Sequence, residues 1–484
     1  MATKRKTLVP ITLVWFRRDL RLSDHAPLNA AMKKHKETGA KIVPLYVLDN
    51  HSPNITKYGS ASLWWLHHSL ETLTHSLKQK GANLLLRSGP SVDVIRELIA
   101  EANIENIYFH HSVLPGEIEL ENELADICKE KQIECKRFKG ELLYTPNSIK
   151  TGSDTPYKVF TPFWRACLEQ PRPAKPIPAP KIIPSPKEFP KSDALESWQL
   201  LPTKPNWAAP FEKLWQPGEE HVEKVIDIFS KGPLATYKKM RDYPSIEGTS
   251  KISPYLAFGN VSIRELWHKV EGKDGADFYQ RELGWREFCY HLLAHWPEVT
   301  KEPFQEKFKN FTWEDNADFL KAWQQGQTGY PIIDAAMRQL WQTGWIHNRL
   351  RMVVGSFLVK NLRLHWHHGA DWFWDTLLDA DLANNTGGWQ WVAGTGADAA
   401  PYFRIFNPVT QSKKFDKEGD FIRGYVPELS DMPNKHIHNP TAAPKDVLKA
   451  AGVTLGKTYP KAIVDLKKSR QIALDAYTNL QNSE

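Results

Sequence analysis

The sequence predicts a protein of two parts, an α/β domain with a doubly wound parallel sheet joined by a long linker to an all-α domain. The chain has 484 residues, which is long for a single hydrophobic core. Its first third alternates short apolar runs with helical patterns, which is typical of parallel strands and their crossover helices. Beyond about residue 210 the pattern is helical almost throughout.

Four apolar runs predict the strands of the first domain. They are "ITLVWF" (11–16), "KIVPLYVL" (41–48), "NLLLRSG" (83–89) and "NIYFHH" (106–111). Between them, "ASLWWLHHSLETLTHSLKQKG" and "SVDVIRELIAEAN" predict helices. We place this domain at residues 1–135. No GxGxxG motif follows the first strand, so a standard dinucleotide site is not expected in it.

A proline-rich segment separates the two parts. "QPRPAKPIPAPKIIPSPKEFPKS", from Gln170 to Ser192, suits neither a helix nor a central strand and predicts an extended connector. We assign the linker to residues 136–210 and the all-α domain to residues 211–484. Within the latter, "NNTGGWQWVAG" (384–394) is predicted to be a loop between helices. Its glycines would let something flat approach the backbone.

Composition narrows the class of protein. Hydrophobic residues make up 41% and charged residues 25%, as in an ordinary globular protein. No apolar run is long enough to span a bilayer, so no membrane partner is expected. "MATKRKTLVPITLVWF" continues into "RRDLRL" without a cleavage site, so we interpret it as a first strand rather than a signal peptide. The net charge of +7 permits a polyanionic partner, and 19 tryptophans suit stacking on bases or on a flat cofactor.

Metal and nucleotide motifs are weak. The four cysteines lack CxxC spacing, so neither a disulfide framework nor a zinc site is expected, and a reducing cytoplasm fits. His291 and His295 stand four residues apart without the glutamate of a zinc helix, so we expect no metal. "AAGVTLGKTYP" is not a phosphate-binding loop, because Gly452 lies one residue too close to the following "GKT".

Two local patterns each allow two interpretations. Hydroxyl residues around Gly248 in "EGTSKISPYLAFG" suit either a cradle for a pyrophosphate or ordinary helix caps. Arg351 and Asp379 are either a buried ion pair or two unrelated surface charges. The residues alone leave both questions open.

Five motifs resemble the photolyase/cryptochrome family, in its order and at close to its spacing, from about residue 11 to about residue 430. They are "WFRRDLRLSDH", "EGTSKISPYLAFG", "ELGWREF", "TGYPIIDAAMRQLWQTGWIHNRLRM" and "DLANNTGGWQWVAGTGADAAPYFRIFNP". The most similar branch uses light to split cyclobutane pyrimidine dimers in DNA. The resemblance implies a folded FAD, active in its reduced anionic form, and damaged single- or double-stranded DNA as partner. It also implies a monomer in a bacterial cytosol or nucleoid.

The resemblance also implies roles for individual residues around the FAD. Asn385 matches the position opposite flavin N5, where plant cryptochromes carry Asp. An electron-transfer chain to the surface is implied for Trp389, Trp366 and Trp313. The implied cofactor-binding positions are Tyr237, Thr249, Ser250, Lys251, Ile252, Ser253, Arg351, Asp379, Ala380, Asp381 and Asn385.

A pocket for the DNA lesion is implied as well. Trp285 and Trp391 match stacking residues that would hold a base turned out of the duplex. Glu282, Asn348 and Met352 match residues that contact the dimer, with Glu282 stabilising its radical anion either protonated or through one oxygen. Photolyases for (6-4) photoproducts carry paired histidines near "HNRLRM", so Asn348 and Met352 favour cyclobutane dimers. The implied DNA-facing positions are Arg286, Arg349, Arg404 and Gln411.

Several alternatives remain at this level. A cryptochrome photoreceptor would keep the same flavin with a signalling output, and a DNA-structure-binding protein would keep it only as a scaffold. A second, light-harvesting chromophore is common in the family, and methenyltetrahydrofolate and a deazaflavin are both open. "LPGEIE" departs from the folate-binding pattern, so Glu117 has no assigned role. "TPFWRACLEQ" and "WVAGTGADAA" also resemble a bacterial branch close to plant cryptochromes, so the subclass stays open.

Overall fold

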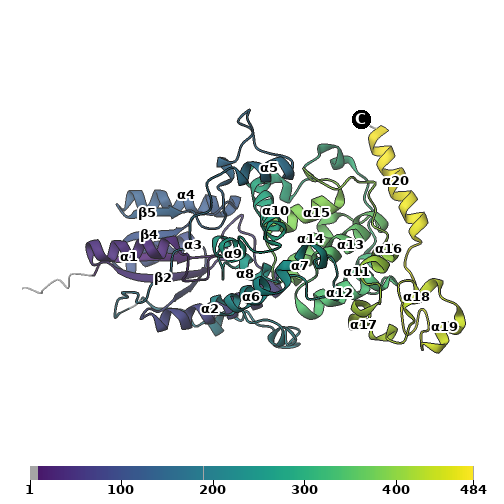
Figure 1. Ribbon diagram of the computed structural model, residues 1–484. Helices are drawn as coiled ribbons and strands as arrows, with labels where there is room; N and C mark the ends of the chain where they lie inside the picture. The colour runs from purple at the N-terminus through teal and green to yellow at the C-terminus, as the bar shows by residue number, and fades with distance from the viewer. Residues whose placement is uncertain (1–8, 189, 483–484) are drawn as a thin grey trace, which may run out of the picture.

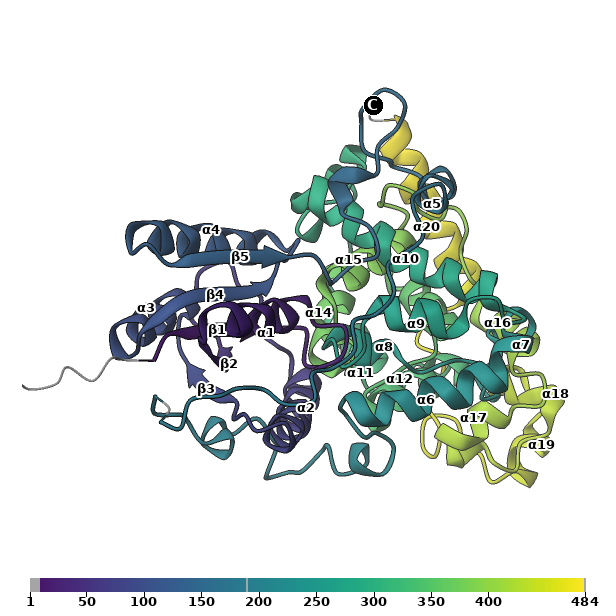
Figure 2. The ribbon, with the colours of Figure 1, turned by 60° about the vertical axis from the view of Figure 1, so that its left-hand side comes forward.

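The computed structural model describes residues 9–188 and 190–482, and it has a sheet domain beside a helical domain (Figures 1 and 2). Five parallel strands lie in the order β3-β2-β1-β4-β5, which is the predicted doubly wound arrangement. Their bounds are β1 Ile11–Phe16, β2 Lys41–Leu48, β3 Leu85–Ser88, β4 Ile104–His110 and β5 Glu134–Phe138. The predicted domain boundary at residue 135 therefore lies inside β5, and the sheet extends three residues beyond it.

Helices cover both faces of this sheet. The core on one face contains side chains of α3 (Ser91–Glu101) and α4 (Pro115–Glu130). The core on the other face contains side chains of α1 (Ala26–Thr38) and α2 (Ser60–Gln79) and continues without a break into the helical domain. Because one core spans both parts, the sheet domain holds the helical domain in a defined position.

The segment after β1 ties the two domains together. The N–H of Leu20 donates to the carbonyl of Phe258 at 3.1 Å, and the Arg21 guanidinium donates to the carbonyl of Gly259 at 3.1 Å. Asp24 pairs with Arg264. The motif "WFRRDLRLSDH" therefore forms the junction between the domains.

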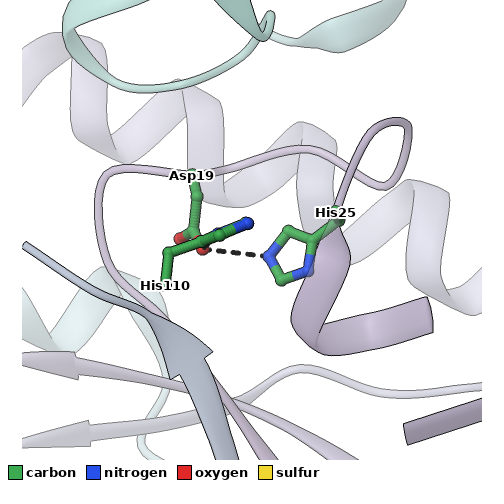
Figure 3. Close-up of side chains that lie close together, drawn as sticks. All are labelled: Asp19, His25 and His110. Carbon is green, nitrogen blue, oxygen red and sulfur yellow. Dashed lines mark hydrogen bonds and ion pairs between the residues drawn. The ribbon is translucent and has the colours of Figure 1, made fainter. Parts of the chain in front are cut away.

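A buried cluster of Asp19, His25 and His110 holds this segment from within (Figure 3). Asp19 Oδ2 lies 2.6 Å from His110 Nδ1 and 3.0 Å from His25 Nε2. His25 Nδ1 accepts the N–H of Leu28 at 3.1 Å, so the ring proton is on Nε2, the atom that lies near Asp19. Burial alone would raise the pKa of Asp19, but the two imidazoles hold that pKa well below its usual range. The ligand atoms of one tetrahedral zinc ion lie roughly 3.3 Å apart. The contacts of 2.6 Å and 3.0 Å are shorter, so they indicate direct polar contacts between Asp19 and the two imidazoles rather than a zinc site.

The linker is more ordered than an extended connector. It contains α5 (Phe160–Leu168), which packs against α10 (Ala276–His295) of the helical domain. Residues 170–188 and 190–192 have no helix or strand, as predicted, but they are bound to the sheet domain. The N–H of Ile42 donates to the carbonyl of Pro184 at 2.9 Å, and Ile177 donates to Asp24 at 3.1 Å.

The second domain is all-α, and α10, α13, α14 and α15 pack together at its centre. None of the helices within the described ranges is long and apolar enough to cross a membrane. Besides α10, the helices are α6 Glu219–Lys231, α7 Pro233–Met240, α8 Ser253–Ala257, α9 Ile263–Val270, α11 Ala317–Gln324, α12 Pro331–Thr343, α13 Asn348–Ser356, α14 Trp366–Thr376, α15 Leu382–Ala393, α16 Pro408–Phe415, α17 Asp420–Tyr425, α18 Asn434–Ile437, α19 Lys445–Ala450 and α20 Leu466–Asn482.

The prediction of a loop at 384–394 is wrong, because nearly all of this stretch lies in α15. Asp381 caps the helix by accepting the N–H of Asn384 at 2.8 Å. A Cβ on Gly387 would lie 2.7 Å from Cys289 Sγ, so that glycine allows α15 to approach α10 closely. Helix packing here outweighs the low helix propensity of glycine.

Candidate functional site

A cavity of about 460 Å³ lies among α10, α13 and α15. Its wall also includes residues 241–242, 377, 379–381 and 396–399. Twelve of the predicted site residues line it, although they come from distant parts of the chain. They are Glu282, Trp285, Asn348, Arg349, Arg351, Met352, Asp379, Ala380, Asp381, Asn385, Trp389 and Trp391.

The Arg351–Asp379 ion pair is present on one wall. Arg351 Nη2 lies 2.7 Å and 3.0 Å from the two carboxylate oxygens of Asp379, whose side chain is 3% exposed. Ser253 Oγ also donates to Asp379, at 2.5 Å. A buried carboxylate needs such partners, and here they fix a charged pair at the cavity surface.

Asp381 and Asn385 organise the start of α15. The hydroxyl of buried Tyr290 donates to Asp381 Oδ2, while Oδ1 accepts from the backbone and side chain of Asn384. Asn385 Nδ2 donates to the carbonyl of Ala370 on α14 at 2.9 Å. This bond orients the Asn385 amide at the edge of the cavity.

The remaining predicted cofactor residues lie outside the cavity lining. Tyr279 donates to Ser250 at 3.0 Å, and Trp345 Nε1 donates to Ser253 at 3.3 Å. The ring of Tyr237 packs against Tyr279 with centroids 5.3 Å apart. The segment that carries Thr249, Ser250, Lys251, Ile252 and Ser253 therefore reaches the cavity through the contact of Ser253 with Asp379.

Glu282 has a partner that the sequence did not reveal. Arg241 donates to both of its carboxylate oxygens, with Nη2 to Oε2 at 2.8 Å. This ion pair fixes the direction of the Glu282 side chain. Arg241 and Asp242 also line the cavity. Arg241 lies one helical turn after Tyr237, and that spacing was the available signal.

The predicted lesion residues occupy another part of the wall. Trp285 is stacked on Phe160 of α5, with centroids 3.7 Å apart and planes at 8°. Arg349 pairs with Asp242 at 2.9 Å and lies over the ring of Phe415. Arg404 is exposed, and Gln411 is half-buried on α16; both are outside the lining.

Arg286, which is predicted to face DNA, makes contacts within the protein. Its side chain is only 12% exposed, and Nη1 donates to the carbonyl of Glu141 at 3.1 Å. The guanidinium lies over the ring of Tyr290 and 3.5 Å from Glu287. Its neighbour Trp285 points into the cavity, and successive helix residues face in different directions.

The three predicted relay tryptophans differ in exposure. Trp389 lines the cavity, Trp366 is fully buried, and Trp313 is half-buried. A Cβ on Gly369 would lie 2.0 Å from Trp389 Cη2, so the ring of Trp389 lies against α14 one turn after Trp366. This order leads from the cavity towards the surface.

A second cavity, of about 710 Å³, lies between the domains. Glu117 lines it and pairs with Arg17 at 3.2 Å and Arg18 at 3.0 Å. Trp15, Tyr46 and Lys301 are also in its wall. Glu117, for which the sequence suggested no role, thus neutralises part of the charge of this cavity.

An aromatic-walled cavity in an all-α domain beside an α/β domain is typical of a cofactor-binding protein. Comparison with known proteins shows which family it belongs to. Residues 12–181 match the family model "DNA photolyase", and residues 278–479 match "FAD binding domain of DNA photolyase". A deoxyribodipyrimidine photo-lyase of Agrobacterium fabrum is 45% identical, covering 97% of this chain and 98% of its own length. Cryptochrome-1 of Arabidopsis thaliana is 35% identical, with 98% and 71% covered.

A solved structure agrees with this relationship. The structure of a bacterial class III photolyase from Agrobacterium tumefaciens has a TM-score of 0.94 at 44% identity, covering 99% of this chain and 100% of that chain. The protein therefore belongs to the DNA photolyase/cryptochrome family, and its helical domain is the FAD-binding domain of that family.

The residues of the main cavity fit FAD. A Cβ added to Gly388 would meet no atom within 4 Å, so the backbone there faces open space that a flat ring can approach. Within the described part of the chain, Trp389 Nε1 is buried without a hydrogen-bond partner. The Arg351–Asp379 pair supplies fixed charge beside these apolar and aromatic walls.

Proposed function

We propose that this protein is a deoxyribodipyrimidine photo-lyase that uses light to split cyclobutane pyrimidine dimers in damaged DNA. The observation that carries the proposal is that residues suited to a flavin and residues suited to a flipped-out dimer line one cavity. Bound FAD, in its reduced anionic form, supplies the electron that light transfers to the dimer and that afterwards returns. No covalent nucleophile is needed.

On the lesion side, the chain binds and orients the dimer. Trp285, held flat by Phe160, offers its free face for stacking on a pyrimidine, and Trp391 offers a second aromatic surface. Glu282, held by Arg241, accepts hydrogen bonds from the base edges. Asn348 and Met352, one turn apart on α13, contact the remaining edge and face of the dimer.

On the cofactor side, the chain controls charge. Asn385 is neutral and presents an amide beside the flavin, which suits an anionic reduced ring. The Arg351–Asp379 pair keeps a guanidinium near the ring without adding net charge. An electron relay runs inward from the surface through Trp313, Trp366 and Trp389. It would return an oxidised flavin to its reduced form.

The interdomain cavity is the candidate site for a second, light-harvesting chromophore. Trp15 and Tyr46 can contact a flat ring, and Arg17, Arg18 and Lys301 can contact carboxylates or phosphates. Methenyltetrahydrofolate and a deazaflavin both satisfy this description. All four cysteines are free, which agrees with a cytoplasmic protein.

The first experiment reduces the flavin-loaded protein and mixes it with oligothymidine that carries cyclobutane dimers. We expect thymine absorbance to recover under blue light and not in the dark. Bound flavin that undergoes photoreduction without any recovery would contradict the proposal and favour a cryptochrome photoreceptor. The similarity to Arabidopsis Cryptochrome-1 makes this the one alternative worth testing.

Arg349→Ala is expected to weaken binding of damaged duplex DNA. The slope of log K against log salt concentration should fall by about one, which corresponds to the loss of one phosphate contact. The physical reason is the loss of a half-buried cation at the cavity edge. Fluorescence anisotropy at several salt concentrations measures both effects. Arg286→Ala is the matched control, because that guanidinium is held internally and its removal should leave the slope unchanged.

Asn385→Asp is expected to destabilise the reduced anionic form of bound FAD, because it places a second negative charge beside the ring. An anaerobic redox titration should show a lower midpoint potential. The variant should keep the fold, since aspartate has nearly the same shape. An unchanged potential would remove Asn385 from the flavin environment.

A further inference from the structure

A histidine lies between the two outer tryptophans of the proposed relay. The ring centroid of His365 is 5.1 Å from that of Trp313 and 5.8 Å from that of Trp366. His365 caps α14, because its Nδ1 accepts the N–H of His367 at 3.2 Å. The cap fixes the imidazole in this position between the indoles.

His365 is uncharged at neutral pH. Burial, together with the neighbouring His367 and His368, lowers the pKa of His365 to about 4. Arg363, two residues before His365 in the sequence, is engaged by Glu314 at 3.0 Å and by the carbonyl of Thr312 at 2.7 Å. His365 therefore adds no positive charge between the two indoles at neutral pH.

A second imidazole touches the buried member of the pair. The centroid of His367 is 3.9 Å from that of Trp366, in an edge-on arrangement, and 4.6 Å from that of His365. Burial also lowers the pKa of His367. In the part of the chain that the structure describes, His367 Nε2 is buried without a hydrogen-bond partner.

We propose that His365 is a positioning residue of the electron relay, a neutral ring that spaces Trp313 and Trp366 and keeps positive charge away from them. The inference rests on the proposed function, which supplies the relay. In the step concerned, one electron passes from Trp313 to the oxidised indole of Trp366, so the positive charge moves outward and no bond forms or breaks. A thiol in solution then returns an electron to Trp313. A cation at position 365 would repel the positive charge on either indole.

The test compares three variants loaded with FAD and illuminated without DNA in the presence of excess thiol. His365→Lys is expected to slow flavin photoreduction at least about tenfold through charge repulsion. His365→Phe, which keeps a neutral ring, should stay close to the wild-type rate. His75→Lys adds the same charge on exposed α2 and should have no effect. Transient absorption of the tryptophan radical provides the second readout.

Equal losses in His365→Lys and His365→Phe would overturn the proposal, because the residue would then act only as a helix cap. Wild-type rates in both would overturn it as well. If His365→Lys does not fold, His367→Lys places the charge beside Trp366 and tests the same claim. A wild-type protein that shows no photoreduction would instead contradict the tryptophan relay of the proposed function, so the two failures are distinguishable.

Discussion

Trp366→Phe is expected to lower the rate of light-driven reduction of bound FAD on the order of a hundredfold, equivalent to about 2.7 kcal/mol on the activation barrier. Phenylalanine is much harder to oxidise than an indole, so the middle step from the cavity to the surface is lost. The same variant, reduced chemically, should still repair dimers, because Trp366 does not line the cavity in which the dimer would bind. Loss of both activities together would contradict a separate relay.

Trp323→Phe is the matched control for this prediction. Trp323 is fully buried and its ring lies 6.1 Å from that of Trp389, but it is not part of the proposed order. Its Nε1 donates to the carbonyl of Val354 at 3.0 Å, so its substitution also disturbs the core. Photoreduction should survive in this variant. An equal loss in both variants would mean that packing, rather than the path, sets the rate.

Arg351→Met is expected to lower the free energy of unfolding by about 3 kcal/mol, because it leaves a buried carboxylate without its cation. The Asp379 side chain is 3% exposed and, among the described residues, would keep the Ser253 hydroxyl as its one side-chain partner. Denaturant unfolding measures this change. The affinity for FAD should fall in parallel, since the pair forms part of the cavity wall.

A double substitution separates the ion pair from the individual side chains. Arg351→Met with Asp379→Asn removes both charges and should recover part of the stability lost in the single variant. Ser253→Ala removes one hydrogen bond to Asp379 and should cost only about 1 kcal/mol. A double variant as unstable as the single one would show that lost packing, not a stranded charge, causes the effect.

Hydrophobic periodicity and segment length were sufficient to predict the first strands of the sheet domain. The runs at 11–16 and 41–48 coincide with β1 and β2, because buried parallel strands are apolar on both faces and stand out from their surroundings. The predicted boundary at residue 135 was less accurate, because it falls within β5. This edge strand has the sequence Glu-Cys-Lys-Arg-Phe, which is half-buried and mixed in polarity and so lacks the apolar pattern of the central strands.

Contacts between residues that lie far apart in the sequence were not predicted from the sequence. Phe160, within the supposed connector, stacks on Trp285, and Arg241 pairs with Glu282 across 41 positions. Arg286 lies next to a cavity residue in sequence yet is held on the interior side of α10. Local spacing can place a residue on one face of a helix, but it does not identify the distant segment that packs there.

The sequence by itself determined the two-domain architecture, the family and most of the residues around the main cavity, because motifs and hydrophobic periodicity are local properties that survive without coordinates. Only the tertiary structure decided that 384–394 is helical, that Arg286 faces inward and that His365 separates two tryptophans. The physical reason is that helix–helix packing and ion pairing between distant segments outweigh local preference. They set the direction of each side chain, and the chemistry of the site depends on those directions.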